Sequence, residues 1–327
     1  MAEERKHTPE SGWKKGALVA NAFLKTDKFV EHYECLKEAA KQYQIALSLL
    51  DNTDLLYPVG GFCYGRMAEK VDALIRENDF ILYWDKDIPL GKMLQHGCES
   101  QGVPVFNSVD AIGICDNKFE TYRKIWEWNQ RCSEAEQIPL IPTVAAPMTY
   151  DTVGYRHMHF VEDVIRELGI PMVLKECYGS FGMQVYLAKT EREVYSYTER
   201  LAGKPFLYQK YLEKSSGKDV RIQVVGEQAV AAMYRFSENG DFRANITNGG
   251  SMKAYQPSAK ECALAVRAVK VLGLDFAGVD LLFGDGEQGG ADVVCEINSN
   301  AHFKNMYTCT GVDVAKCIMG YIREKID

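Results

Sequence analysis

Several features that would assign this protein to a class are missing from its sequence. No apolar run approaches the length of a membrane span, and the N-terminal stretch MAEERKHTPESGWKKG lacks the apolar core of a signal peptide. The 10 cysteines include no C-x-x-C pair, so we expect reduced, buried thiols. Basic residues (38) are fewer than acidic ones (45), which argues against extended nucleic-acid binding. We therefore expect a cytoplasmic protein that has no nucleic-acid or membrane partner.

The first third of the chain lacks the glycine pattern of a dinucleotide site after its first apolar run. Short apolar runs alternate there with two helical patterns, which predicts a small parallel sheet that serves as a scaffold and a substrate wall. The glycine-rich segment 57–67 has two readings, a plain connector or a substrate loop. The runs cover 16–23, 45–49, 80–84 and 103–106, and the helical patterns cover 29–43 and 89–100.

The remainder of the chain predicts a different order of elements: strand, helix, strands, helix, hairpin, helix. Asp116 is the expected N-cap of a helix over 118–132. Thr190 with Glu193, and Ser258 with Glu261, have the spacing of capping boxes. We therefore expect an α/β domain followed by an α+β domain. The predicted boundaries are a disordered tail over 1–15, the first domain over 16–115 and the second over 116–327.

Acidic residues occur within two apolar runs near the C-terminal end, 276–283 and 292–297. A glycine-containing loop separates these runs, which predicts an antiparallel pair with Asp280 opposite Glu296. Asn298 lies two residues beyond Glu296 and so shares its face. Carboxylate and amide oxygens suit Mg²⁺, and the pattern predicts a metal-nucleotide site. The alternative is a pair of strand-edge acids that face solvent.

These residues also carry a resemblance to a known family. AGVDLLF, CEINSN and TGVDVAKCIMGYI resemble the last part of the ATP-grasp fold in its RimK-type branch, the ligases that include the enzyme adding glutamates to a ribosomal protein. The resemblance implies an ATP-grasp domain with a glycine-loop lid over about 142–206. It also implies that Asp280, Glu296 and Asn298 hold two Mg²⁺ (or Mn²⁺) ions between the ATP phosphates.

Lys175 ends the apolar strand MVLK, and the loop ECYGSFGM follows it. A lysine at the end of a buried strand can place a point charge on a phosphate while loop N–H groups approach it. A snorkelling surface lysine beside an ordinary turn is the alternative. The resemblance implies that Lys175 binds the α and β phosphates with a lid loop containing Gly179, Ser180 and Gly182.

The segment LYQKYL (207–212) reads by itself as a half-buried strand with a solvated lysine. The resemblance implies instead that the Gln209 side chain and the main chain of Lys210 and Leu212 meet the adenine. It further implies Lys118 as a second ATP lysine and Asp219 as the ribose-side acid. Asp219 could otherwise be a turn residue after a glycine.

Three arginines complete the candidate set. The run GDFRANITNGGS matches the family's GDFR-x-N pattern, which implies that Arg243 and Asn245 contact the phosphates being transferred. Arg221 and Arg235 lie on adjacent predicted strands as candidate ligands of an acceptor carboxylate or an acyl phosphate. A guanidinium group binds either anion through two hydrogen bonds. Each arginine alone could equally be ordinary surface charge.

The resemblance weakens after Asn298, where SNAHFK stands in place of the proline and glycine of relatives. His302 is then either a pH-tuned group beside the metal or a histidine packed at a helix start. His157 and His159 have no third ligand nearby in sequence, so zinc is not expected.

Together these features predict an ATP-dependent carboxylate-amine ligase that forms an amide through an acyl phosphate. The expected substrates are an amino acid and an amino acid, peptide or protein terminus, and we expect a homo-oligomer. The alternatives are an ATP-grasp kinase or acyl-CoA-type ligase, and a nucleotide-binding sensor without turnover.

Overall fold

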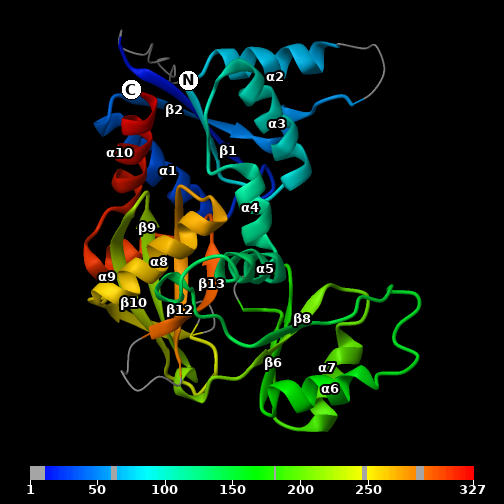
Figure 1. The fold of residues 1–327 in the computed structure, drawn as a ribbon. Helices are drawn as coiled ribbons and strands as arrows, with labels where there is room; N and C mark the ends of the chain where they lie inside the picture. Colours follow the sequence, from blue (N-terminus) through cyan, green and yellow to red (C-terminus); the bar gives the residue numbers. More distant parts are fainter. Residues whose placement is uncertain (1–11, 60–64, 180–181, 245–248, 285–290) are drawn as a thin grey trace. The chain divides into compact units, whose positions relative to one another are not determined.

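The structure is a computed structural model that describes residues 12–59, 65–179, 182–244, 249–284 and 291–327 (Figure 1). The chain forms two compact units. Unit 1 comprises residues up to Ile112 together with His302–Lys304 and Asp313–Asp327, and unit 2 comprises Gly113–Ala301 and Asn305–Val312. The predicted boundaries at 15/16 and 115/116, and the lid at about 142–206, stay predictions, and the tail falls largely outside the described residues.

Unit 1 contains a four-stranded sheet in the order β2-β1-β3-β4, and every pair in it is parallel. This confirms the small parallel sheet predicted from the alternating pattern. Its central strands are apolar and buried, because helices cover both faces of such a sheet. The strands are β1 (Lys14–Ala20), β2 (Ile45–Asp51), β3 (Phe80–Tyr83) and β4 (Val105–Phe106).

The helices of unit 1 include one that the sequence did not predict. Helix α2 begins directly after the glycine-rich segment at 57–67, of which residues 60–64 lie outside the described residues. Helix α1 buries Tyr33, Leu36 and Ala40 along one face, as its apolar spacing predicts. The bounds are α1 (Asp27–Gln42), α2 (Arg66–Arg76), α3 (Ile88–Gln101) and α10 (Val314–Ile326), with a 3₁₀ turn at Asn52–Leu55.

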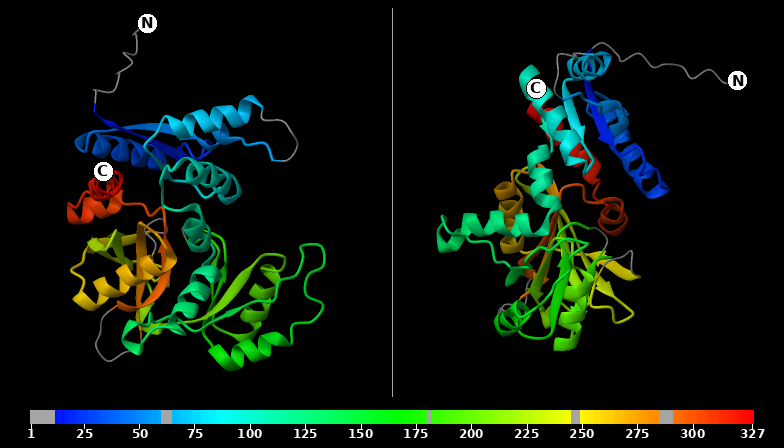
Figure 2. Two further views of the ribbon diagram at one scale, coloured as in Figure 1. Left: turned by 45° about the horizontal axis from the view of Figure 1, so that its top comes forward. Right: turned by 90° about the vertical axis from the view of Figure 1, so that its right-hand side faces the viewer.

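Unit 2 contains a five-stranded antiparallel sheet in the order β11-β10-β9-β12-β13. Helix α8 packs across it (Figure 2). The predicted capping box of Ser258 and Glu261 starts this helix, and Gly273, at φ 75°, ends it. The bounds are β9 (Lys218–Val225), β10 (Gln228–Ser237), β11 (Gly250–Ala254), α8 (Ala259–Leu272), β12 (Phe276–Phe283) and β13 (Ala291–Asn298).

A second sheet of unit 2 has the order β5-β8-β6-β7, with α6 and α7 packed on it. Buried residues such as Val164, Leu174, Val194 and Tyr208 join the two helices to the sheet. Strand β7 was not predicted. The bounds are β5 (Thr143–Ala145), α6 (Phe160–Leu168), β6 (Met172–Glu176), β7 (Val185–Ala188), α7 (Glu191–Arg200) and β8 (Phe206–Lys210).

The predicted N-cap at Asp116 is wrong by one residue. Asp116 ends helix α4 (Val109–Asp116), and the Asn117 side chain accepts hydrogen bonds from the first N–H groups of α5 (Lys118–Asn129). Both residues are good N-caps, so sequence alone does not choose between them. The remaining elements are α9 (Lys304–Thr310) and 3₁₀ turns at Glu134–Glu136 and Glu213–Ser215.

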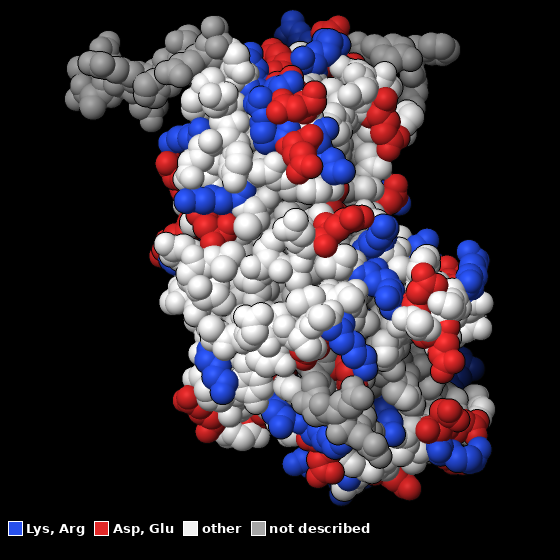
Figure 3. Space-filling view, turned by 60° about the vertical axis from the view of Figure 1, so that its left-hand side comes forward, with Lys and Arg blue, Asp and Glu red and all other residues white. Residues whose placement is uncertain are grey.

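The surface and the thiols add two observations. Side chains of both signs are interspersed on the face drawn in Figure 3, and none of the helices within the described ranges is long and apolar enough to cross a membrane. The nine described cysteines are free thiols, but Cys35 is exposed and only three are buried, so the prediction of uniformly buried thiols is wrong. Cys63 lies outside the described residues.

Candidate active site

The hairpin of β12 and β13 has the predicted register. The two strands pair antiparallel, with Asp280 opposite Glu296 and Gly278 opposite Asn298. A register shift after Asp280 leaves this alignment intact. Side chains that are directly opposite on adjacent strands point to the same face, so the two carboxylates and the amide share one face, as predicted.

A cleft lies between the two sheets of unit 2. The space within and in front of it, including the part open to solvent, is about 920 Å³. Its apolar wall includes Val173 and Leu282, and its polar wall carries lysines, arginines and acids from both sheets. Twelve of the predicted site residues line it: Lys118, Lys175, Gly179, Gly182, Gln209, Lys210, Leu212, Asp219, Arg235, Arg243, Asp280 and Glu296. An apolar wall combined with convergent charges is typical of a ligand site.

Lys118 contacts both the loop at Gly179 and the hairpin of β12 and β13. It is the first residue of α5, where the Asn117 cap fixes the helix start. Its Nζ donates to the Gly179 carbonyl at 2.8 Å and lies 3.6 Å from Glu296 Oε1. Its side chain is only 13% exposed. A largely buried ammonium group thus lies beside Gly179 and Glu296, for which the resemblance implies phosphate and metal binding.

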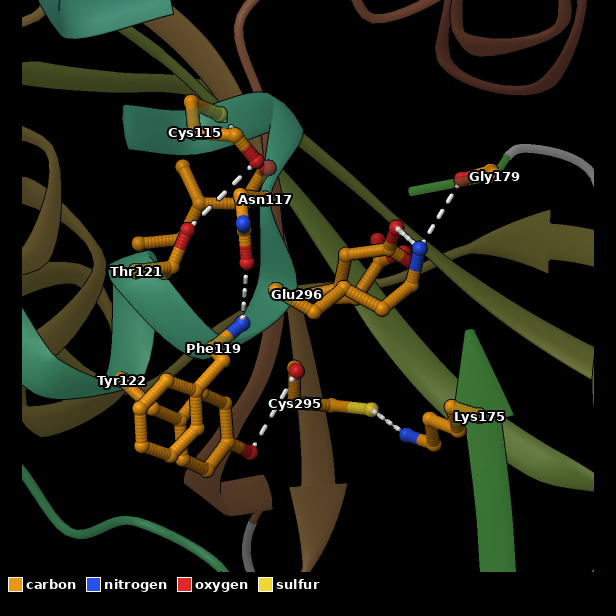
Figure 4. Close-up of polar contacts among 12 residues, drawn as sticks. Cys115, Asn117, Phe119, Thr121, Tyr122, Lys175, Gly179, Cys295 and Glu296 are labelled. Carbon is orange, nitrogen blue, oxygen red and sulfur yellow. Dashed lines mark hydrogen bonds and ion pairs between the residues drawn. The ribbon is translucent and has the colours of Figure 1, made fainter. Parts of the chain in front are cut away.

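Lys175 points from β6 towards Cys295 on β13 (Figure 4). Its Nζ lies 3.7 Å from Cys295 Sγ. Burial raises the pKa of the Cys295 thiol, and the lysine charge opposes that shift. Behind this strand the buried Tyr122 hydroxyl donates to the Val294 carbonyl at 2.8 Å, and burial raises the pKa of Tyr122. The thiol therefore stays neutral beside the lysine, and both side chains line the cleft.

Arg243 contacts the main chain at Gly182. Its Nη1 donates to the Gly182 carbonyl at 2.6 Å, while Nε and Nη2 bind the Asp241 carboxylate at 3.0 and 2.7 Å. These hydrogen bonds lower the pKa of Asp241 and raise that of Arg243. Arg243 and Lys118 therefore both contact loop carbonyls from the cleft side.

Four charged side chains form a buried network beneath the cleft. Arg221 binds both oxygens of Asp280 at 2.6 Å, and Arg235 binds both oxygens of Asp219 at 2.7 Å. Arg235 Nη2 also reaches Asp280 Oδ2 at 2.9 Å and joins the two pairs. Burial alone would raise the pKa of Asp280, but the two guanidinium groups outweigh it and lower that pKa. The network is neutral overall and fixes the Asp280 carboxylate.

Arg221 and Arg235, which were predicted to bind an acceptor carboxylate or an acyl phosphate, bind carboxylates of the protein in the structure. Both use Nε and Nη2 for carboxylates of the protein. Burial opposes the charge of Arg235, but Asp219 and Asp280 outweigh it and raise its pKa. A contact to an acceptor carboxylate or an acyl phosphate would have to use Nη1, so that role stays a prediction.

The donor set suits a hard cation. Asp280 accepts three hydrogen bonds from arginines, which leaves about one of its four lone-pair sites. Glu296 has one ion pair and a side chain that is 33% exposed. No group of three or more His, Cys, Asp or Glu converges in the described part of the chain. Two carboxylates and an amide oxygen, with waters and phosphates completing the shell, fit Mg²⁺.

The C-terminal end of β8 also lines the cleft, and a side-chain hydrogen bond holds it to β5. Gln209 is buried, lines the cleft and donates from Nε2 to Thr143 Oγ1 at 3.0 Å. Lys210, Tyr211 and Leu212 line the cleft beside it. This is where the resemblance predicts the adenine, and the apolar Ile141 and Leu212 also line the cleft.

Some predicted residues fall elsewhere, and some lining residues were not predicted. Ser180 and Asn245 lie outside the described residues. Arg221 and Asn298 share the polar face but do not line the cleft. The unpredicted lining residues include Glu176, Met183, Gln184, Tyr211, Lys218, Phe242 and Cys295. Tyr211 and Lys218 adjoin predicted residues, which was the available signal for them.

Four of the histidines lie in two clusters. His302 packs in unit 1 against His32 and Phe29, with ring centroids at 4.5 and 5.4 Å, which supports the packed alternative. His157 and His159 lie with their rings 4.6 Å apart and are both exposed.

Solved structures of other proteins share the fold of this chain. Solved structures with the same fold include the D-cycloserine synthetase DcsG (15% identity, TM-score 0.68, 96% of this chain and 100% of that one). Another is the ATP-grasp ligase PsnB complexed with minimal precursor, Mg and ADP (15% identity, TM-score 0.64, 95% of this chain and 98% of that one). At these identities the likeness shows the fold alone: that of ATP-grasp enzymes.

Sequence comparison is more specific. Residues 146–322, more than half of the chain, match the RimK-like ATP-grasp domain. The chain belongs to the RimK-like ATP-grasp family and is an ATP-grasp ligase of the class that forms C–N bonds, as predicted. An "Uncharacterized protein MG012 homolog" of Mycoplasma pneumoniae is 30% identical over 304 residues, covering 91% of this chain and 96% of that protein.

Relatives with named activities match over shorter stretches. A "Probable alpha-L-glutamate ligase" of Halorhodospira halophila is 38% identical over 173 residues, 52% of this chain and 56% of that one. "Beta-citrylglutamate synthase B" of Danio rerio is 30% identical over 239 residues, 73% of this chain and 54% of that one. The chain thus spans about half the length of these named relatives.

Proposed function

We propose that this protein uses ATP to activate a carboxylate and joins it to the amino group of an α-amino acid. L-glutamate is the first candidate for a substrate, because glutamate occurs in the names of both kinds of named relative. The acid or peptide that it is joined to is open. The observation that carries the proposal is one cleft in which Lys118, Lys175 and Arg243 face Asp280 and Glu296.

In this proposal the cleft binds ATP along its length. Gln209 and the main chain of Lys210 and Leu212 meet the base, and Asp219 meets the ribose. The cations Lys118, Lys175 and Arg243 bind the phosphates with Asn245, and the lid loop of Gly179, Ser180 and Gly182 covers them. Cationic side chains and loop N–H groups stabilise phosphate charge most strongly where water is excluded.

Asp280, Glu296 and Asn298 would hold two Mg²⁺ (or Mn²⁺) ions. Bound there, the ions would neutralise charge on the phosphate oxygens during transfer. The arginines keep Asp280 ionised and oriented, so that this acid is ready for binding without rearrangement.

The proposed reaction has two steps. A carboxylate oxygen of the substrate attacks the γ-phosphorus, ADP leaves, and an acyl phosphate forms. The amine then attacks the acyl carbon, and inorganic phosphate leaves with the former carboxylate oxygen as the amide forms and a proton is released. Lys175 and Arg243 spread the negative charge in the first step, and Arg235, which lines the cleft, would stabilise the oxyanion of the second step through Nη1.

The test is ADP release with a panel of amino acids, carboxylic acids and short peptides, followed by mass spectrometry of the products. The proposal expects ADP formation that requires both a carboxylate and an amine, with an amide product. ADP formed with a carboxylate alone and a stable phosphorylated product would instead identify a kinase. ATP binding with no ADP over the whole panel would identify a sensor.

A further inference from the structure

The amide side chains of Gln223 and Asn298 lie beside the proposed metal site. Gln223 on β9 and Asn298 on β13 are each in register with Gly278 on β12, so the three residues form one row across adjacent strands. The next row along the same face contains Asp280 and Glu296. Since residues two apart on a strand share a face, the amides directly adjoin the acids.

Each of these amides has a buried atom without a partner. Gln223 Oε1 and Asn298 Nδ2 make no hydrogen bond within the described ranges of the chain, and Gln223 is 1% exposed. Buried polar atoms in native proteins are almost always satisfied by protein, water or a ligand. Among the described residues the row therefore offers one unused acceptor and one unused donor next to Asp280 and Glu296.

Gly278 creates the space in which the Gln223 amide lies. A Cβ placed on Gly278 would lie 3.3 Å from Gln223 Oε1 and 2.6 Å from Ala301 Cβ. Any other residue at this position would displace the amide oxygen or the alanine. The absence of a side chain on the central strand thus allows the Gln223 oxygen to extend over it.

We propose that Gln223 and Asn298 form the subsite for the α-amino acid that supplies the amine, an inference that rests on the proposed function. Gln223 Oε1 accepts a hydrogen bond from the amino group, and Asn298 Nδ2 donates to the carboxylate of the same molecule. Asn298 Oδ1 stays available to the cation. An α-amino acid carries N–H donors and acceptor oxygens on neighbouring groups, which matches a row with one acceptor and one donor.

The subsite selects and positions its substrate rather than performing a chemical step. An amide oxygen is not a base at neutral pH, so Gln223 holds the nitrogen beside the acyl group without taking its proton. A simple amine such as hydroxylamine carries no carboxylate for Asn298 and gains little from the pair. An ordered water that bridges both amides is the rival occupant.

The direct test is calorimetric binding of amino acids, with L-glutamate first and the other standard amino acids next, in the presence of Mg²⁺ and a non-hydrolysable ATP analogue. Gln223→Met has a similar length and no acceptor, and we expect it to weaken binding about tenfold or more. Gln223→Glu retains an acceptor oxygen and should retain binding. Gln101 is the matched control, because its Oε1 is also buried without a partner, in α3; Gln101→Met should leave binding unchanged.

Two outcomes overturn the subsite. One is that no amino acid binds the wild-type protein. The other is equal binding by wild-type and Gln223→Met, as a bridging water predicts. Thermal unfolding of each variant checks the fold, and loss of a buried unsatisfied amide should not lower the melting temperature.

A second arm separates this subsite from the ligase proposal. Hydroxylamine replaces the amino acid in an assay with the carboxylate substrate and ATP, and it traps an acyl phosphate as a hydroxamate. We expect equal hydroxamate yields from wild-type and Gln223→Met, with an increase of about tenfold or more in KM for the amino acid alone. If wild-type yields no hydroxamate, the ligase mechanism fails. If it does and the two KM values agree, only the subsite fails.

Discussion

The parallel sheet of unit 1 and the five-stranded sheet of unit 2 bury opposite kinds of side chain. In unit 1 the central strand β3, Phe80–Tyr83, is apolar and fully buried. In unit 2 the five-stranded sheet buries Arg235 and Asp280 at 4% exposure and Gln223 at 1%. The first arrangement stabilises a scaffold through apolar burial, whereas the second carries desolvated charges that only balanced pairing can keep folded.

This difference indicates that the functional site lies on the charged face of the unit 2 sheet. A strand that is apolar and fully buried, such as β3, offers no side-chain polar group to a ligand, while the buried charges on one face of the unit 2 sheet must be paired. In unit 2 arginines satisfy Asp219 and Asp280, whereas among the described residues Glu296 has one ion pair, with Lys118 at 3.6 Å. Four substitutions test this contrast.

The largest effect is expected from Glu296→Ala. Loss of this carboxylate should lower kcat at least about a thousandfold, which is about 4 kcal/mol of activation free energy, while the fold stays intact. Steady-state ADP release and thermal unfolding measure both. Glu227→Ala, which removes an exposed carboxylate from its pair with Lys270, is the control and should change neither. Near-normal turnover by Glu296→Ala would rule out the metal assignment.

Removing one member of the buried network should affect stability most. Arg235→Met leaves Asp219 and Asp280 without a shared partner, and we expect a loss of about 3 kcal/mol in the free energy of unfolding. Urea denaturation measures it. Arg166→Met breaks only an exposed pair with Asp163, so it should cost less than about 1 kcal/mol. Equal losses in the two variants would contradict the described network.

In unit 1 a buried histidine, His32, should make the free energy of unfolding depend on pH. Burial lowers the pKa of His32 well below 6.5, and the charges of His302 and Lys28 lower it further. The unfolded chain therefore binds a proton that the folded chain excludes, so stability is lost as pH falls below about 6.5, by up to about 1.4 kcal/mol per pH unit.

His32→Phe should remove that slope between about pH 6.5 and 5, measured as the free energy of unfolding against pH. The exposed His96 supplies the control, and His96→Gln should keep the slope. An unchanged slope in His32→Phe would show that the buried histidine is not its source.

The smallest effect concerns the hydroxyl behind the cleft. Tyr122→Phe removes the hydrogen bond to the Val294 carbonyl and should cost about 1 kcal/mol of stability. Tyr307, which is 55% exposed, is the control position for the same change. A large loss of kcat in Tyr122→Phe would mean that this hydroxyl acts in the chemistry and not only behind it.

The sequence predicted those parts of the site that lie close together along the chain. Asp280 and Glu296 belong to one hairpin, and acids within apolar runs are uncommon enough to mark a site. The capping box at Ser258 and the glycine that ends α8 were likewise readable from short-range spacing.

Ion pairs between residues far apart along the chain could not be predicted from the sequence. Arg221 and Asp280 are 59 residues apart, and their pairing depends on the register of β9 against β12. The Lys118 contact with Glu296 crosses a longer separation still. Helix α2 was missed because its start follows a glycine-rich segment that reads as a loop.

The most direct test of the ligase mechanism is the fate of oxygen. The carboxylate substrate is labelled with ¹⁸O, and the inorganic phosphate released during amide formation is analysed by mass spectrometry. The mechanism predicts one ¹⁸O transferred to phosphate for each amide formed, because the carboxylate oxygen attacks the γ-phosphorus and leaves with it. Amide formation with unlabelled phosphate would contradict it.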